Sequence, residues 1–169
     1  LSRMRAAVLA HQGAARLLAQ GEAELSAFWT DSATGIACRC RPDWFNGTTL
    51  VDLKSCLDAS SRGFSRAIAN LGYDVQAAFY VDGIRRVTGT ELPFVFVAVE
   101  KEAPHAVAVY RADPEIIEIG RKKYQAALQL LKWCQESGTW PAYQPAGEVE
   151  LISLPRWAAN AEAFEFDAA

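Results

Sequence analysis

The fold of this chain is decided by the stretch from Arg39 to Lys54, which reads RCRPDWFNGTTLVDLK. Within it, the dipeptide Asn46-Gly47 lies between two segments that alternate polar and apolar residues. Asn-Gly is the strongest short-range signal for a β-hairpin, because both central residues of a type I′ turn need a positive φ. The stretch therefore predicts two antiparallel strands joined by a two-residue turn.

That turn determines which side chains share a face of the hairpin. It places Phe45 opposite Thr48, and the further pairs follow, because cross-strand partners and residues two apart share a face. One face is predicted to carry Arg39, Arg41, Asp43, Asp52 and Lys54. The other is predicted to carry Cys38, Cys40, Pro42, Trp44, Val51 and Leu53. We therefore expect an apolar core face and a face with two carboxylates beside a cation.

The two aspartates of the charged face have the spacing of a metal site. Diagonal neighbours on a hairpin lie about 7–8 Å apart, so Asp43 and Asp52 can reach one cation between them. Mg²⁺ prefers oxygen ligands and is often held by one or two carboxylates plus substrate phosphate. Lys54 could orient an attacking water or stabilise charge that develops on the phosphate. The alternative is a solvated hairpin face with ordinary surface charges.

A third acid, Glu24, lies in a segment that alternates and is predicted as a strand, residues 24–30. If the loop before the next strand has four residues, Thr30 lies opposite Gly35 and Glu24 lies opposite Arg41. Glu24 then joins the charged face near Asp43. A register slip of one residue would move Glu24 to the other face.

Two motifs together carry a resemblance to a known superfamily. Pro42-Asp43 followed by Asp52-Leu53-Lys54 resembles the PD-(D/E)XK signature of metal-dependent nucleases. Gln76-Ala-Ala-Phe-Tyr80 resembles the Gln-x-x-x-Tyr motif that follows the D-x-K strand in the RecB-like branch of that superfamily. The amino-acid sequence around these motifs is most similar to the nuclease domain of RecE-type prophage exonucleases (exonuclease VIII), over about residues 4 to 157. The similar runs are residues 51–55, 72–80, 94–102 and 106–110.

The resemblance implies a fold, an activity and partners. The implied fold is α/β, a restriction-endonuclease-like central mixed sheet flanked by helices. The implied activity is a Mg²⁺-dependent exonuclease on double-stranded DNA ends, with Mn²⁺ as a substitute, resecting one strand 5′ to 3′ in phage or prophage recombination. The implied partners are a homo-oligomeric ring around DNA and a single-strand annealing protein.

The resemblance also implies roles for individual residues. The implied catalytic set is Asp43, Asp52, Lys54, Gln76 and Tyr80. The implied metal ligands are Asp43, Asp52, the Leu53 carbonyl and, at a second or water-mediated position, Glu24. The candidates for DNA contact are Arg41, Arg62 and Arg66. Two alternatives stay open: an endonuclease or a nuclease of other polarity with the same metal chemistry, and a non-catalytic DNA-binding or assembly module.

Composition limits the class of protein. The 169 residues predict one domain, and 51% hydrophobic with 22% charged residues is typical of a globular protein. A net charge of −3 counts against a general nucleic-acid coater, but a nuclease needs only a few placed cations. The longest strongly apolar run, residues 94–99, is too short to span a membrane.

The cysteines and the chain ends give further expectations. The four cysteines form no C-x-x-C pair, which argues against zinc and favours a reducing, cytoplasmic compartment. Neither His11 nor His105 has metal-ligand spacing. Because the sequence starts at Leu1, we expect a fragment lacking upstream residues, with a loosely held tail from about residue 158.

The remaining pattern predicts the order of elements. Ser60 or Asp58 can cap a helix that Gly72 interrupts. Asp113-Pro114 is a typical helix start, and Gly138 a typical stop. The predicted helices cover residues 4–19, about 60–71, 73–87 and 114–137. The predicted strands cover 24–30, 35–43, 48–54, 94–100, 106–111 and, at an edge, 149–154. Residues 140–143 are predicted to form a packed aromatic turn.

Overall fold

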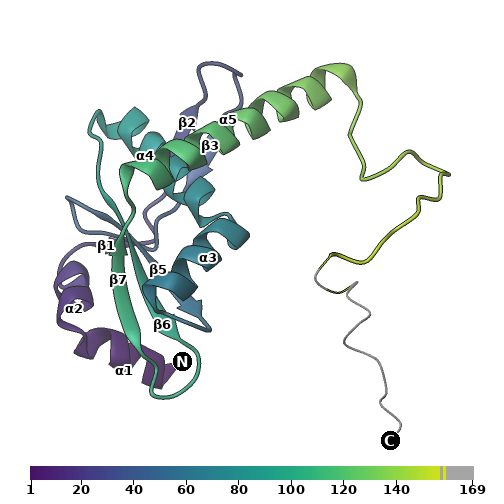
Figure 1. Cartoon of the computed structure of the whole chain (residues 1–169). Coiled ribbons are helices and arrows are strands. Elements are labelled where there is room, and N and C mark those ends of the chain that lie inside the picture. Colours follow the sequence, from purple (N-terminus) through teal and green to yellow (C-terminus); the bar gives the residue numbers. More distant parts are fainter. Residues whose placement is uncertain (157, 159–169) are drawn as a thin grey trace, which may run out of the picture.

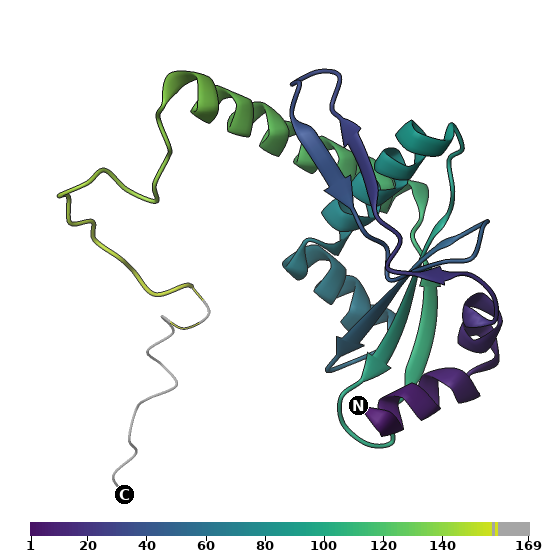
Figure 2. The same cartoon turned by 180° about the vertical axis from the view of Figure 1, so that it is seen from behind.

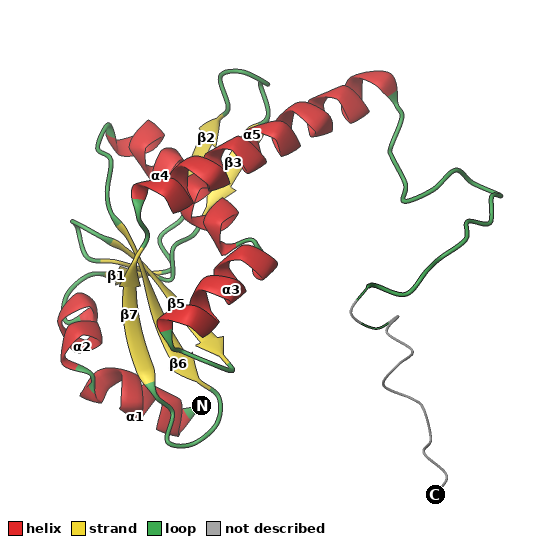
Figure 3. Ribbon diagram, viewed as in Figure 1, coloured by secondary structure: helices red, strands yellow, loops and turns green. Residues whose placement is uncertain are grey.

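A computed structural model describes residues 1–156 and 158 of the chain (Figure 1). Two helices are followed by five strands, two helices, two strands and a long last helix (Figure 3). In chain order the elements are α1 (Ser2–Ala10), α2 (Gln12–Leu18), β1 (Glu22–Ala23), β2 (Ala27–Thr30), β3 (Ala37–Cys40), β4 (Trp44–Phe45), β5 (Leu50–Cys56), α3 (Ser61–Leu71), α4 (Tyr73–Thr88), β6 (Phe94–Glu100), β7 (Val107–Arg111) and α5 (Pro114–Ser137).

The central sheet has five strands in the order β1-β4-β5-β6-β7. Strands β5 and β6 are parallel, and the other neighbouring pairs are antiparallel. Parallel neighbours need a long crossover connection, and α3 and α4 supply it. The sheet is therefore mixed and flanked by helices, which confirms the predicted α/β class.

Helices cover both faces of the central strands. On one face, Phe64 and Ile68 of α3 and Ala77 of α4 pack on Leu50 and Phe96. On the other face, Val8 of α1 and Ala14 of α2 form a second cluster. The strands contribute Val51, Val97 and Val99 to it. The two clusters lie on opposite sides of β5, so both faces of this strand are covered. The predicted division into one apolar and one charged face is wrong, because Asp52 lies within the larger core.

The hairpin register differs from the prediction by two residues. Phe45 pairs with Leu50, so the loop has four residues, not two. The reason is the Asn46 side chain: its Oδ1 accepts from the Thr48 amide at 3.1 Å, and its Nδ2 donates to the Leu17 carbonyl at 3.3 Å. Because side chains alternate with period two, Trp44 and Val51 still share a face as predicted, whereas Cys40, predicted for that face, packs in the cluster of Leu50.

The segments before the hairpin are more broken than predicted. Of the strand predicted over 24–30, only the second half forms, as β2; β1 precedes the predicted range, and Glu24 follows β1 in the left-handed region at φ 58°. Strands β2 and β3 form a separate two-stranded sheet in which Thr30 pairs with Ala37. This is again a two-residue slip, and Asp31 shapes the longer loop by accepting from the Thr34 amide at 2.9 Å.

The first predicted helix, over residues 4–19, is also divided. His11 leaves the helical region with ψ 113°, and its Nδ1 accepts from the Ala14 amide at 3.2 Å. It therefore caps the start of α2. The sequence expectation that His11 is neither a ligand nor catalytic did not foresee this capping role.

The helices around the crossover follow their predicted signals. Ser60 caps α3 by accepting from the Gly63 amide at 3.1 Å, and Gly72 ends that helix at φ 69°. Asp113 caps α5 by accepting from the Ile116 amide at 2.7 Å, and Pro114 is the first helical residue. On α5, Cys134 is buried and Tyr124, Leu128 and Leu131 are half-buried.

After Gly138 the chain leaves the body of the molecule (Figures 1 and 2). Trp140 and Tyr143 are exposed, so the predicted packed aromatic turn is wrong. Residues 149–154 form no strand within the single chain, so the edge strand predicted there is also wrong. The predicted loose tail lies, apart from residue 158, outside the described residues. Within the described part, no helix has the length and apolarity needed to cross a membrane.

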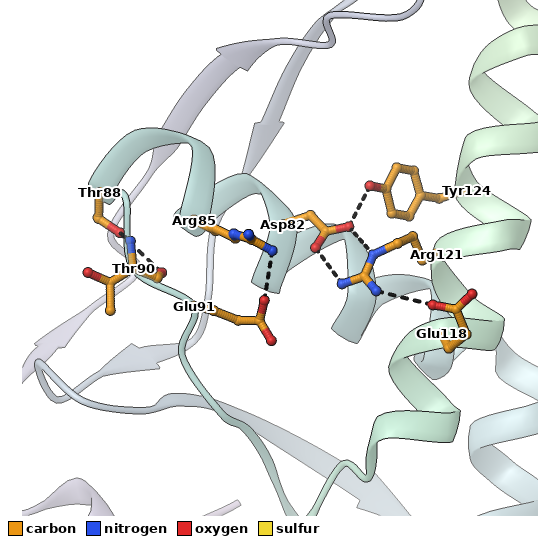
Figure 4. Close-up of polar contacts among 8 residues, drawn as sticks. All are labelled: Asp82, Arg85, Thr88, Thr90, Glu91, Glu118, Arg121 and Tyr124. Carbon is orange, nitrogen blue, oxygen red and sulfur yellow. Dashed lines mark hydrogen bonds and ion pairs between the residues drawn. The ribbon is translucent and has the colours of Figure 1, made fainter.

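Helices α4 and α5 are joined by a polar cluster at their crossing (Figure 4). The Asp82 carboxylate accepts from Arg121 Nε and Nη2, each at 2.7 Å, and from the Tyr124 hydroxyl at 2.6 Å. Burial opposes the charge of Asp82, but these hydrogen bonds outweigh it and hold its pKa below the ordinary 3.8. Burial and Asp82 together raise the pKa of Tyr124 to about 12.

This cluster predicts a pH-dependent stability. A carboxyl whose folded pKa is lowered stabilises the fold above its unfolded pKa and loses that contribution as the pH falls through the folded value. Asp82→Asn should therefore lower the free energy of unfolding by about 2 kcal/mol at pH 7, and by much less below about pH 3. Urea denaturation at both pH values measures this.

The matched control is Glu118→Gln, which removes an exposed partner of the same Arg121. Its effect should stay within about 0.5 kcal/mol at either pH. An Asp82→Asn loss that is equal at both pH values would contradict the role given to the charge.

Candidate active site

The centre of the candidate site is Asp52, in the middle of β5. Its side chain is 1% exposed, although it is a carboxylate. Oδ1 accepts a hydrogen bond from Gln76 Nε2 of α4 at 2.8 Å. Oδ2 lies 2.5 Å from Lys54 Nζ, two residues along the same face of the strand. The crossover thus places an amide on the buried acid, and the strand itself supplies the ammonium.

The Oδ2 atom of Asp52 is incompletely satisfied. It is fully buried and has no donor in hydrogen-bond geometry, so its contact with Lys54 is a close ionic contact without hydrogen-bond alignment. Burial raises the pKa of Asp52, and the nearby Asp43 adds to the rise, while Lys54 and Gln76 oppose it. An under-compensated carboxylate in a core is expensive to maintain, and such groups concentrate at functional sites.

Lys54 is held from two sides. One is Asp52, and the other is the ring of Tyr73, whose centroid lies 4.6 Å from Nζ. A cation over an aromatic face is attracted by the ring quadrupole, which adds to the fixation of the ammonium. Tyr73 begins α4 directly after Gly72, so the helix start positions it. Sequence reasoning missed Tyr73; its only signal was its place within the run of residues 72–80.

Asp43 reaches the same region from the chain before β4. Its Oδ2 accepts from the Leu53 amide at 2.7 Å, which ties Asp43 to the strand that carries Asp52. The two acids are close enough for the charge of Asp43 to raise the pKa of Asp52. The structure therefore brings together Asp43, Asp52, Lys54 and Gln76.

Glu24 has a different immediate partner. Its amide donates to the Asp43 carbonyl at 3.2 Å, so its backbone lies beside the site. Its carboxylate, however, is exposed and pairs with Arg41 Nε at 2.7 Å. The backbone of Glu24 thus lies beside that of Asp43, but the Glu24 carboxylate does not contact Asp52.

The other predicted residues lie around this centre. Tyr80, one turn after Gln76, packs edge-on against Phe94 with ring centroids 6.2 Å apart. It also lines a polar hollow of about 260 Å³ together with Ser26, Arg39, Cys40 and Arg41. On α3, Arg62 and Arg66 are exposed, and neither side chain forms an ion pair with a described residue.

The residues present fit a hard divalent cation better than a soft one. The oxygen donors are the carboxylates of Asp43 and Asp52 and the Leu53 carbonyl, and the unsatisfied Asp52 Oδ2 is an atom that a cation would compensate. Within residues 1–156, no group of three or more His, Cys, Asp or Glu could hold a metal. The donor set therefore suits a hard divalent cation that keeps waters and substrate phosphate as its remaining ligands.

Comparisons with known proteins agree with this geometry. A family model described as a PDDEXK-like domain of unknown function (DUF3799) matches residues 1–155. A crystal structure described as a "Putative exonuclease" from Eubacterium rectale superposes with a TM-score of 0.66 at 15% identity, over 95% of this chain and 64% of that chain. This likeness shows the fold.

A structure of the protein SSO0001 aligns over 74% of this chain and 62% of that chain, with a TM-score of 0.41 and 16% identity. This score is too low to carry an argument. The chain thus spans less than two thirds of the length of either solved structure. A comparison with curated proteins finds no match.

The ion pair predicts a strong coupling between Lys54 and Asp52. Lys54→Met should lower the free energy of unfolding by about 3 kcal/mol at pH 7 with a chelator present, because it leaves a buried carboxylate without its counter-charge. Adding Asp52→Asn to that variant should restore most of the loss. The loss should also shrink as the pH falls, because protonation of Asp52, whose pKa is already raised, removes the unpaired charge.

Urea denaturation of the two single variants and the double variant measures the coupling. Lys122→Met is the matched control, since Lys122 pairs only with Glu118 at the surface of α5, and its effect should stay within about 0.5 kcal/mol. Additive effects of the Lys54 and Asp52 substitutions would show that the pair is not coupled.

Proposed function

This chain belongs to the family of PDDEXK-like domains (DUF3799), and on that premise we propose that it is a nuclease that hydrolyses phosphodiester bonds of DNA with Mg²⁺. The observation that carries the proposal is the buried Asp52, which lies between Lys54 and Gln76 and beside Asp43. Both sequence motifs, which are separate in the chain, converge on this one carboxylate.

Asp43, Asp52 and the Leu53 carbonyl would hold the cation. When bound, a divalent cation polarises a phosphoryl oxygen and lowers the pKa of a coordinated water. Gln76 fixes Oδ1 of Asp52, so that Oδ2 keeps one orientation. Glu24 is a candidate for a second, water-mediated position because its backbone adjoins Asp43.

Lys54 supplies a positive charge that is not itself a metal ligand. In the structure its ammonium lies on Asp52 Oδ2 and over Tyr73. We assign to it the orientation of the nucleophilic water and the stabilisation of charge that develops on the phosphate. Pre-positioned donors of this kind are effective because they need no rearrangement at the moment of reaction.

DNA contacts are assigned to cations near this centre. Arg41 and Tyr80 line the polar hollow, and Arg62 and Arg66 project from α3 without ion-pair partners among the described residues. A few placed arginines are compatible with the net charge of −3. Tyr80 lines this hollow from α4 and packs on Phe94.

The finer proposal is an exonuclease that acts on double-stranded ends, 5′ to 3′, in phage or prophage recombination. The support is the resemblance of the motifs to RecE-type enzymes and the name of the Eubacterium rectale structure. The same resemblance supports a ring around DNA with a single-strand annealing protein as partner, and the cysteine pattern supports a cytoplasmic setting.

Substitutions at the centre test the nuclease proposal. Asp52→Asn should abolish cleavage of end-labelled duplex in Mg²⁺ and weaken Mn²⁺ binding in calorimetry, because it removes a ligand charge. Lys54→Ala should slow cleavage about 10²–10³-fold, while Mn²⁺ affinity stays within a few-fold. The exposed Glu102→Gln is the matched control and should leave both readouts unchanged.

Unchanged cleavage by the Asp52→Asn protein would contradict the proposal that this site is the nuclease active site. Loss of Mn²⁺ binding in Lys54→Ala would contradict the non-ligand role of Lys54. Binding of duplex without cleavage in Mg²⁺ or Mn²⁺ would favour a DNA-binding module instead.

The exonuclease proposal has a separate test. A protein that needs an end should degrade a linearised plasmid and spare the same plasmid as a covalently closed circle, since only the linear form offers a terminus. Gel analysis at equal protein and DNA concentrations compares the two forms, and 5′ against 3′ end label gives the polarity. Equal cleavage of both forms would show an endonuclease.

A further inference from the structure

Strand β7 is an open edge of the central sheet. It is the last strand in the order β1-β4-β5-β6-β7, so only β6 pairs with it. Residues 107–110 are half-buried and Arg111 is exposed, whereas its neighbour β6 is buried except at Glu100. The edge contains no proline, lysine or bulge, which are the usual devices that keep an edge from pairing.

The hydrogen-bond pattern shows which backbone groups face outward. Glu100 donates to the Ala106 carbonyl and Ala112 donates to the Phe94 carbonyl, each at 2.9 Å. In an antiparallel pair the hydrogen-bonded positions alternate, so the even-numbered residues of β7 face β6. The N–H and C=O groups of Val107, Val109 and Arg111 therefore point to the free edge, and no described residue hydrogen-bonds to them.

A second segment of the chain is complementary to this edge, because its sequence is strand-like and it has no partner strand among the described residues. Residues 149–154 read Val-Glu-Leu-Ile-Ser-Leu, form neither helix nor strand, and are exposed, with Val149 at 98% and Leu151 at 97%. Their backbone forms no hydrogen bond with another described residue. Gly147 and Pro155 bound the segment, as turn-forming residues commonly bound strands.

We propose that residues 149–154 of one copy of this chain add as an antiparallel strand to the free edge of β7 in a second copy. Main-chain hydrogen bonds give such strand addition its affinity, and alternate side chains give it specificity. The occupant of the edge is thus a segment that the chain itself carries.

One register matches every side chain to a compatible partner. It pairs Arg111 with Glu150, Val109 with Ile152, Val107 with Leu154, Tyr110 with Leu151, and Ala108 with Ser153. Directly opposed side chains share a face, so one ion pair and three apolar pairs form. In the parallel orientation Glu150 would lie at Val107 and Leu154 at Arg111, which is why the antiparallel orientation is favoured.

The proposed register also extends the existing core. Val107 and Val109 already pack against the cluster of Val8, Val97 and Val99 beneath α1 and α2. Ile152 and Leu154 would lie beside them on that face, and Leu151 would lie beside Tyr110 on the other. Exposed apolar side chains of this segment would thereby leave water, which is favourable in proportion to the area buried.

The geometry of the chain favours a second copy over the same copy. Helix α5 begins next to the end of β7 and carries Gly138 about 36 Å away. The dozen residues from Thr139 to Glu150 reach at most about 40 Å when fully extended. They are not fully extended, because the Glu148 amide donates to the Pro145 carbonyl at 3.3 Å in a turn. Figures 1 and 2 both show this arm directed away from β7.

Proline substitutions test the register without metal or DNA, so the outcome is independent of nuclease activity. In the proposed pairing the Ile152 N–H faces β7, and the Ser153 N–H faces away. Ile152→Pro should therefore weaken self-association at least about tenfold, and Ser153→Pro should leave it within a few-fold. Sedimentation velocity from about 1 μM to about 1 mM protein, with chelator, measures the dissociation constant.

The edge itself is tested by Val109→Pro. This substitution removes an outward N–H and leaves the ladder to β6 intact, and circular dichroism verifies its fold. It should weaken self-association as Ile152→Pro does. Mixed in equal amounts, these two variants should form one heterodimer, since one keeps the edge and the other keeps the segment. If Val109→Pro unfolds, the Ile152 and Ser153 variants still decide the question, because both residues are exposed in the single copy.

Three results would overturn the proposal: a wild-type chain that stays monomeric at the highest concentration, equal effects of Ile152→Pro and Ser153→Pro, or a folded Val109→Pro protein that associates like the wild type. The first result would also be expected if the segment folded back on its own β7.

Discussion

The burial of one carboxylate, Asp52, is the constraint on which the rest of the structure depends. A charge in a core is tolerated only when fixed partners surround it, and here those partners come from β5 and α4. The parallel pairing of β5 with β6 requires a crossover, and the crossover is what brings Gln76 and Tyr73 over the strand. Fold and candidate site are therefore one arrangement, because the elements that form the sheet also surround the acid.

The sequence predicts the elements with local signals well and the connections between them less well. The caps at Ser60 and Asp113 are residues whose side chains act within three positions, so their helices are confirmed. Both hairpins differ from prediction by two residues, because loop side chains, Asn46 in one and Asp31 in the other, form bonds that strand pattern does not reveal. Trp44 and Val51 nevertheless share their predicted face, since side-chain direction in a strand repeats every two residues, whereas Cys40 packs in the opposite cluster.

At the candidate site, sequence reasoning named residues that the structure brings together, but it did not foresee their environment. The spacing that put Asp52 and Lys54 on one face could not show that α3 and α4 cover that face, which depends on long-range packing. The sequence therefore predicted a charged surface, whereas Asp52 lies inside a core. The contact of Lys54 with Tyr73 was not predictable either, because it depends on the angle at which α4 begins after Gly72.

The crossover has a consequence for contact order. The contact of Asp43 with Leu53 joins residues 10 positions apart, whereas that of Gln76 with Asp52 joins residues 24 apart. Non-local contacts need closure of a longer loop and the loss of more chain entropy. A chain with only its local hairpins would keep Asp52 hydrated, so the desolvation of this acid belongs to the docking of α4. The energetic penalty of the site is thus concentrated in one non-local event and is not spread over the whole sheet.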